Sequence, residues 1–183
     1  SELCLSGAMH RGLIEIGALR ALEELEIVKS DSLKKAIGTS IGSIILFMYI
    51  IGYSCNDMID IILRTDTKLF GDISLKGPKS IFQGLEIKNW ILLWSRLKIS
   101  DIDTLTSIQF YTKYGIHFIS TAVCLETQSV EYFDHETWPD ILIIDQLMAT
   151  ISLPFVFPPC SIGQYTYLDG GLLNNFPVNK INN

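Results

Sequence analysis

The sequence predicts an α/β fold built on a parallel sheet that helices cover. Within the first 53 residues a short apolar strand, a helix, a second short strand and a second helix follow one another closely. This alternation is typical of a parallel sheet that helices cover on both faces. Strand-like segments return after residue 115. The chain has 183 residues, of which 48% are hydrophobic, so one domain with a sizeable core is expected.

The N-terminal part contains both predicted parallel strands. Residues 3–7 form a short apolar run that ends in glycine, which indicates a buried strand. Apolar residues recur at helical spacing from Arg11 to Glu26, which predicts a helix. Residues 34–40 form the second short strand, and residues 41–53 a nearly all-apolar helix. The longest apolar run, residues 44–52, is shorter than the roughly 20 residues that span a bilayer.

The middle of the chain is predicted to be mainly helical. Helices are expected over residues 56–64, 86–98 and 101–114, the last of them opened by Asp101 as an N-cap residue. Residues 71–84 contain glycine and proline and are expected to be a loop.

The C-terminal part returns to β structure. Neighbouring strands are expected over residues 116–127 and 129–135, followed by a short helix over residues 145–152 that Pro154 ends. Residues 163–171 are predicted to be a strand that runs into a glycine turn. No interdomain linker is recognisable, so residues 1–183 are expected to form a single domain, and truncation at both ends is left open.

Composition bounds the function classes. The net charge is −6 and the pI about 5.0, which argues against a nucleic-acid partner. The four cysteines lie far apart and no C-x-x-C pair or His-rich tract is present, so no metal is predicted. Widely spaced cysteines favour buried free thiols in a reducing compartment, with disulfides left open. An intracellular location, cytoplasmic or at the membrane periphery, is expected, and secretion is left open.

Ser40 is the candidate nucleophile. Residues 38–42 read G-T-S-I-G between a predicted strand and a predicted helix. A sharp strand-to-helix turn holds a serine hydroxyl clear of its neighbours and crowds the positions two before and two after it, where Gly38 and Gly42 relieve the clash. The helix N-terminus also favours negative charge that develops during attack. The alternative interpretation is a structural turn.

Asp169 is the candidate base. None of the three histidines has a recognisable setting as a partner of Ser40, although a triad that uses one of them stays formally open. The segment Y-L-D-G-G, residues 167–171, puts Asp169 at a strand end, followed by Gly170 and Gly171, which let backbone and substrate come close. The alternative is an ordinary Asp-Gly turn.

Taken together, the motifs resemble those of the patatin-like phospholipase family. The nucleophile turn at 38–42 and the D-G-G of 169–171 stand in the family's order, and N-N-F-P-V follows at 174–178. Residues 149–159 are similar to the family's stretch of small residues and prolines, and residues 5–12 stand where the family has its glycine-rich oxyanion loop. The resemblance covers the chain nearly end to end.

The resemblance implies a fold and a mechanism. The fold would be a patatin-like three-layer α/β sandwich with a mainly parallel central sheet. Ser40 would attack the ester carbonyl, Asp169 would accept its proton, and an acyl-enzyme would form and be hydrolysed without metal or cofactor. The substrates would be lipid acyl esters, usually membrane phospholipids or lysophospholipids and sometimes neutral glycerides. Peripheral membrane contact is therefore expected.

The oxyanion loop departs from the family pattern. Gly7, Gly12 and the basic residue Arg11 are kept, but Ala8 and Met9 replace the second and third glycines. The resemblance assigns the oxyanion hole to Gly7, Ala8 and Met9. It makes Arg11, with Gly12, a loop anchor or a phosphate contact. Because side chains disfavour positive φ, the alternative is a weak or inactive patatin-fold module that binds lipid or a partner protein.

The predicted helix over residues 86–98 has two possible roles. Trp90, Leu93, Trp94 and Leu97 follow a helical spacing within residues 86–98 and predict one apolar stripe. Core packing is the more usual role of such a stripe. An interfacial lid or anchor is the alternative, because indole rings suit the membrane boundary.

Overall fold

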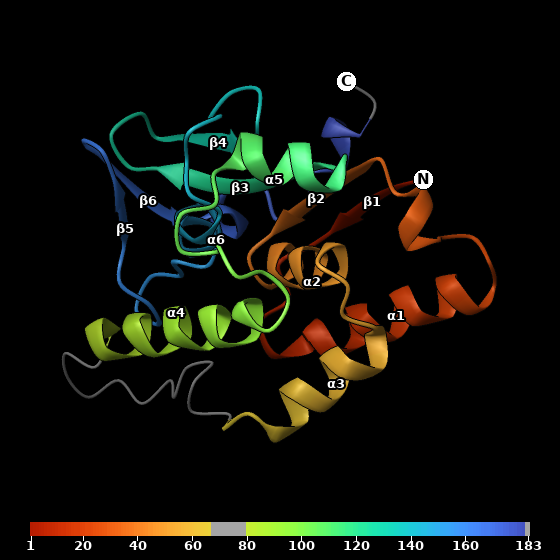
Figure 1. Ribbon diagram of the computed structural model, residues 1–183. Helices are drawn as coiled ribbons and strands as arrows, with labels where there is room; N and C mark the ends of the chain where they lie inside the picture. The colour runs from red at the N-terminus through yellow and green to blue at the C-terminus, as the bar shows by residue number, and fades with distance from the viewer. Residues whose placement is uncertain (67–79, 182–183) are drawn as a thin grey trace.

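A six-stranded sheet organises the chain. In the computed structural model, which describes residues 1–66 and 80–181, the strands run in the order β1-β2-β3-β6-β5, and β4 pairs with β3 as well (Figure 1). β1, β2 and β3 are parallel neighbours, β4 and β6 are antiparallel to β3, and β5 is antiparallel to β6. Four strands therefore point one way and two the other, and the predicted α/β class with a mostly parallel sheet is confirmed. The strands are β1 (Glu2–Leu5), β2 (Lys35–Thr39), β3 (His117–Cys124), β4 (Ser129–Phe133), β5 (Cys160–Ile162) and β6 (Tyr165–Asp169).

One face of the sheet carries the α-helices of the described residues, whereas the sequence pattern predicts helices on both faces. α2 (Ile41–Ile50) and α6 (Ile143–Thr150) contact the strands and each other, and α1 (Gly12–Glu24) and α4 (Ser80–Arg96) contact their outer sides. α3 (Cys55–Arg64) lies beside α1 in this outer layer (Figure 1). The main apolar core lies between these layers and includes buried residues of α1, α2 and α6.

The other face carries the C-terminal segment. Thr39 Oγ1 donates to the carbonyl of Asn174 at 3.2 Å, and Lys35 Nζ donates to the carbonyl of Lys180 at 2.8 Å. Residues i and i+2 of a strand share a face, so Lys35 and Thr39 project to one side of β2. The segment after β6 therefore crosses the face of the sheet that lies opposite α2.

Several element boundaries differ from the sequence prediction. α4 begins at Ser80, so the last residues of the predicted loop 71–84 are helical, and residues 67–79 lie outside the described residues. α5 spans Ser107–Tyr114 rather than 101–114, because a capping box starts it: Gln109 Oε1 accepts from the Thr106 amide at 2.9 Å. The short strand β5 was not predicted; it forms a hairpin with β6 around Gly163, whose φ is +60°.

The apolar stripe of α4 divides between core and surface. Trp90 is buried, and its Nε1 donates to Thr65 Oγ1 at 3.0 Å. Leu93 and Leu97 are 57% and 66% exposed, so the expected single face does not form. Trp90 and the partly buried Trp94 pack on the main core, and the two leucines face outward. All four cysteines are free. No helix in the described ranges combines the length and the apolar character that crossing a bilayer requires.

Candidate active site

Ser40 occupies a strained turn between β2 and α2. Its φ of 54° and ψ of −128° are uncommon for a residue with a side chain. The amide of Ser40 donates to Thr150 Oγ1 at 2.9 Å, and the Ser43 amide donates to the Ser40 carbonyl at 2.9 Å. These bonds fix the turn from both sides, and the side chain stays half-buried. The geometry is that of a nucleophile elbow.

The flanking glycines are required by close approach. A Cβ added to Gly38 would lie 2.5 Å from the backbone nitrogen and Cα of Ser43. A Cβ added to Gly42 would lie 2.5 Å from the carbonyl oxygen of Ser6. Gly38 therefore lets the helix start directly after the strand, and Gly42 lets the loop after β1 pack on the first turn of α2.

The sheet register brings Asp169 next to Ser40. Thr39 of β2 pairs with Thr121 of β3, and Asp169 of β6 pairs with the next residue, Ala122. β4 pairs with residues 120–124 of β3, a range that includes residues paired with β2 and residues paired with β6. β4 must therefore occupy one edge of β3, and β2 and β6 share the other edge. Their C-terminal ends meet there.

The two side chains are in direct contact. Ser40 Oγ donates to Asp169 Oδ2 at 2.6 Å. Asp169 is only 3% exposed, and its Oδ1 accepts from the Gly171 amide at 2.7 Å. Burial raises the pKa of Asp169 above its ordinary 3.8, while the bonds from Ser40 and Gly171 act in the opposite direction. The carboxylate is thus a stronger base than an exposed aspartate, and it is aimed at the serine hydroxyl.

The two glycines after Asp169 let this turn pack tightly. A Cβ on Gly170 would overlap Thr121 Oγ1, and a Cβ on Gly171 would come within 2.8 Å of Asn175 Oδ1. Thr121 is a buried residue of β3, and its Oγ1 lies 2.6 Å from Thr39 Oγ1. The turn therefore rests directly on the sheet beside the end of β2.

The loop after β1 runs beside Ser40 and is held at two points. The Gly7 amide donates to the Asn175 carbonyl at 3.1 Å, and Asn175 Nδ2 donates to the Gly7 carbonyl at 2.9 Å. Ser6 donates to Glu15 Oε1 through both its amide, at 3.0 Å, and its hydroxyl, at 2.7 Å. A Cβ on Gly7 would overlap Asn175 Oδ1 and lie 3.3 Å from Ser40 Cβ.

The backbone of the substituted positions in this loop differs from the sequence expectation. Met9 adopts a positive φ of 48°, whereas Ala8 has a φ of −137°, which any residue adopts. Strain is therefore confined to Met9, where it costs on the order of 1 kcal/mol. The expectation that Ala8 would strain the loop was wrong, because its φ does not require a glycine.

Gly12 and Arg11 lie where α1 begins. A Cβ on Gly12 would lie 2.9 Å from Ile41 Cγ1, so this glycine lets α1 pack on the first turn of α2. Arg11 is exposed, and its guanidinium has no hydrogen bond or ion pair among residues 1–66 and 80–181. An anchoring contact of Arg11 to the loop is thus not seen in the described part of the chain.

An apolar pocket adjoins the Ser40–Asp169 pair. Its empty volume, part of which is open to solvent, is about 450 Å³. Ser40 and Asp169 are the polar side chains of its lining, and the other lining residues are apolar: Met9, Ile41, Ile44, Ile87, Ile151, Leu153, Val156 and Phe157. A concave apolar site with a few convergent polar groups is typical of a site for an apolar ligand.

Comparison with known families decides the assignment. The family model described as patatin-like phospholipase matches residues 3–180. The chain belongs to the patatin-like phospholipase family. The match includes the elbow at Ser40 and the turn at Asp169, so the resemblance inferred from the motifs is confirmed.

Relatives of similar sequence come from two viruses and a bacterium. A probable lipid hydrolase of Invertebrate iridescent virus 6 is 30% identical over 189 residues, which cover 96% of this chain and 61% of the relative. An uncharacterized protein of Acanthamoeba polyphaga mimivirus is 27% identical, with 97% of this chain and 60% of the relative covered. Uncharacterized protein YqhO of Bacillus subtilis is 25% identical, with 94% and 64% covered. The chain spans about three fifths of the length of these relatives.

Solved structures support the patatin-like fold. VipD from Legionella pneumophila superimposes with a TM-score of 0.69 at 14% identity, covering 96% of this chain and 46% of that chain. ExoU of the type III secretion system of Pseudomonas aeruginosa, solved in complex with SpcU, gives a TM-score of 0.55 at 19% identity, covering 86% and 39%. At these identities the likeness concerns the fold.

Three polar residues of the patatin-like site were not found from the sequence. Thr150, Glu15 and Asn175 hold the elbow and the loop after β1 through the bonds described above. Thr150 and Asn175 lie inside motif segments of the family, but no spacing rule marked their partners. His117 and His135 form their own cluster with Asp134 and take no part in the contacts of Ser40.

Proposed function

We propose that this chain is a serine-dependent lipid acyl hydrolase that cleaves fatty-acyl esters of phospholipids or lysophospholipids. The proposal is carried by the 2.6 Å hydrogen bond from Ser40 Oγ to Asp169 Oδ2 at the end of an apolar pocket. Family membership and a relative described as a probable lipid hydrolase support the substrate class. The nucleophile, its base and a site for the acyl chain are then adjacent, as acyl transfer requires.

The reaction follows from this arrangement. Asp169 takes the hydroxyl proton as Ser40 Oγ attacks the ester carbonyl, and a tetrahedral intermediate forms. Collapse of the intermediate releases the alcohol, which receives the proton from Asp169, and leaves the acyl group on Ser40. Asp169 then deprotonates a water molecule that attacks the acyl-enzyme. As the fatty acid leaves, Ser40 Oγ takes the proton back from Asp169. Asp169 thus alternates between base and acid.

Backbone amides are the proposed oxyanion donors. The Gly7 amide is already bonded to Asn175, whereas those of Ala8 and Met9 donate no hydrogen bond among the described residues. We assign the donor role to these two amides, with the N-terminus of α2 adding a favourable dipole. Asn175 and Glu15 then act as positioning residues, because they hold the loop that carries the donors.

Arg11 is the proposed contact for a lipid phosphate. Its guanidinium is exposed and without a partner among the described residues, and it follows the loop directly. A guanidinium suits a phosphate because it donates two parallel hydrogen bonds.

Apolar side chains around the site are the proposed membrane contact. Phe155 is 98% exposed at a φ of +69° and stands between pocket residues Leu153 and Val156. Met9 lines the pocket and is also exposed. With a net charge of −6, attraction to anionic lipid is not expected for the chain as a whole. Insertion of apolar side chains is therefore the stronger source of affinity.

Replacing Phe155 by Ser tests this contact. Loss of an inserted ring, worth roughly 2 kcal/mol, should lower fatty-acid release from phosphatidylcholine vesicles by about tenfold or more. Hydrolysis of a short-chain p-nitrophenyl ester in solution should change much less. Leu63→Ser is the matched control, because Leu63 is 68% exposed on α3 and does not line the pocket. Equal losses on both substrates would contradict a membrane role for Phe155.

The activity itself is tested on the unmodified chain. We expect covalent labelling of Ser40 by a fluorophosphonate probe, located by peptide mass spectrometry, and release of fatty acid from phospholipid or lysophospholipid vesicles. Labelling without lipid hydrolysis would support a serine hydrolase of another ester class. Absence of both would support the non-catalytic lipid-binding module instead.

A further inference from the structure

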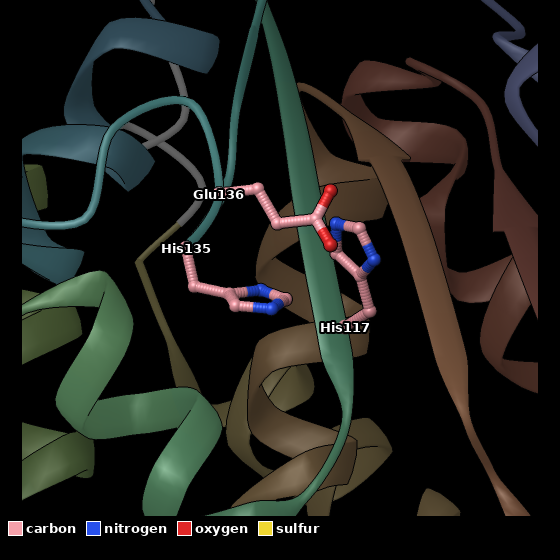
Figure 2. A group of neighbouring side chains, drawn as sticks. All are labelled: His117, His135 and Glu136. Carbon is pink, nitrogen blue, oxygen red and sulfur yellow. The ribbon is translucent and has the colours of Figure 1, made fainter.

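A second group of polar side chains lies away from the Ser40 site. His117 begins β3, and His135 and Glu136 follow the end of β4 (Figure 2). One nitrogen from each histidine and one carboxylate oxygen of Glu136 all lie within 4.8 Å of one another. The pairing of β3 with β4 joins Ser120 to Phe133, and three residues further along this register His117 comes opposite Glu136. The topology therefore brings these side chains together.

The His117 ring is held from behind by a buried carboxylate. Asp134 Oδ2 lies 3.1 Å from His117 Nε2. Asp134 Oδ1 accepts from the amides of Glu136, at 2.9 Å, and Thr137, at 2.7 Å. The same carboxylate thus fixes both the His117 ring and the turn that carries Glu136. Histidine metal ligands commonly have such a carboxylate as their outer partner.

His135 is oriented by an aromatic neighbour. Its ring stacks on Tyr111 of α5 with centroids 3.7 Å apart and planes at 5°. The His117 ring meets it edge-on at 4.5 Å. His135 Nδ1 is buried and has no hydrogen-bond partner among the residues that the structure describes. A buried nitrogen without a partner is uncommon, because its desolvation is not compensated.

We propose that His117, His135 and Glu136 bind a divalent transition metal ion, and that Zn²⁺ is the ion that fits them best. Two imidazoles and one carboxylate are a ligand set that suits zinc, with a water molecule in a fourth position. Ligands at about 2.0–2.1 Å from a tetrahedral zinc lie roughly 3.4 Å apart. The three ligand atoms, which now lie within 4.8 Å of one another, must therefore come closer together to bind zinc. Glu136 is exposed and free to rotate toward the histidines.

The surroundings allow a metal to enter and suggest what it does. His117 and Glu136 line a cleft that also includes Asp134, and its empty volume, part of which is open to solvent, is about 860 Å³. His117 pairs with Lys35 at the start of β2, whereas Ser40 follows the end of that strand. The metal would thus sit at the other end of β2 from the reaction and tie the start of β3 to the turn after β4. Its role is stabilising, and it is independent of the proposed hydrolase activity.

Thermal unfolding with added zinc tests the site. Chelator-treated protein should gain about 5 °C or more in melting temperature at a zinc concentration near one hundred times the dissociation constant. Glu136→Gln, a surface change that keeps side-chain size, should weaken zinc affinity at least tenfold. His135→Phe keeps a ring to stack on Tyr111 and should abolish the gain. Fluorophosphonate labelling of Ser40 should be the same in these variants as in the unmodified chain.

Asp140→Asn is the matched control, because Asp140 is an exposed carboxylate close in sequence but outside the group. It should keep the full zinc response. No zinc-dependent shift in the unmodified chain would overturn the proposal. A shift of the same size in Glu136→Gln and His135→Phe would also overturn it, since zinc would then bind elsewhere.

Discussion

Replacing Asp169 by Asn is expected to lower fluorophosphonate labelling at Ser40, and ester hydrolysis with it, by about 10³–10⁴-fold. An amide keeps the size of the carboxylate but cannot take the serine proton, and a general base contributes roughly 10²–10⁴ in rate. The effect should be near the upper end because Ser40 Oγ has its 2.6 Å contact with this carboxylate. Ser40→Ala should abolish labelling completely. Labelling of Asp169→Asn at the unmodified rate would show that another group is the base.

The same change should leave folding intact or strengthen it. Burial raises the pKa of Asp169, so the folded state favours the protonated form more than the unfolded state does. The contribution of Asp169 to stability is then greatest at low pH and declines as pH rises from the unfolded value to the raised one. At pH 7 the ionised, buried carboxylate costs stability, and an uncharged Asn avoids that cost. A melting temperature equal to or above that of the unmodified chain would separate lost chemistry from lost structure.

The pH profile of labelling follows from the same pKa. Because only the ionised carboxylate accepts a proton, labelling should fall as pH drops through the raised pKa of Asp169. The midpoint should therefore lie above 3.8, the ordinary value for an aspartate. Asp140→Asn, which changes an exposed carboxylate, should leave the profile unaltered.

Local patterns predicted the two central residues, but not why they meet. Gly38 and Gly42 around Ser40, and the glycines after Asp169, are signals within five residues. The contact between the two side chains depends instead on β2 and β6 sharing one edge of β3. That pairing is antiparallel for β6 and joins segments far apart in the chain. Without the resemblance to a known family, no spacing within the sequence would have paired Ser40 with Asp169.

The groups that sequence reasoning missed depend on tertiary contacts. Glu15 and Asn175 are isolated polar residues in the sequence. Their partners, Ser6 and Gly7, lie in the loop after β1, and only the folded backbone brings them together. His117 and His135 stand 18 positions apart without a metal-binding spacing, and only the β3–β4 pairing aligns them. The predicted start of α5 was wrong for a local reason. The helix begins after Thr106, which forms a capping box, and not after Asp101, the N-cap residue expected from the sequence.

Gly38→Ala is expected to have a large effect on stability and labelling, and Gly17→Ala is its control. In Gly38→Ala the new methyl group would lie 2.5 Å from the backbone nitrogen and Cα of Ser43. Backbone atoms at the start of α2 cannot swing aside as a side-chain end can. Gly17 offers the opposite case, because it lies in α1, is exposed, and nothing stands within 4 Å of an added Cβ. Both variants add one methyl group, so they differ in environment rather than in chemistry.

Gly38→Ala is expected to destabilise the fold by about 2–4 kcal/mol, because α2 must move away from β2 to relieve the overlap. For a chain of this size that corresponds to a fall in melting temperature of roughly 5–15 °C. The movement would also carry Ser40 out of reach of Asp169, so labelling should be lost in the molecules that still fold. Gly17→Ala should raise stability by about 0.5–1 kcal/mol, since alanine is the better helix former, and should label normally. If Gly38→Ala instead melts and labels like the unmodified chain, the turn at Ser40 is not held by close packing of β2 against α2, and the strained geometry of the serine must have another cause.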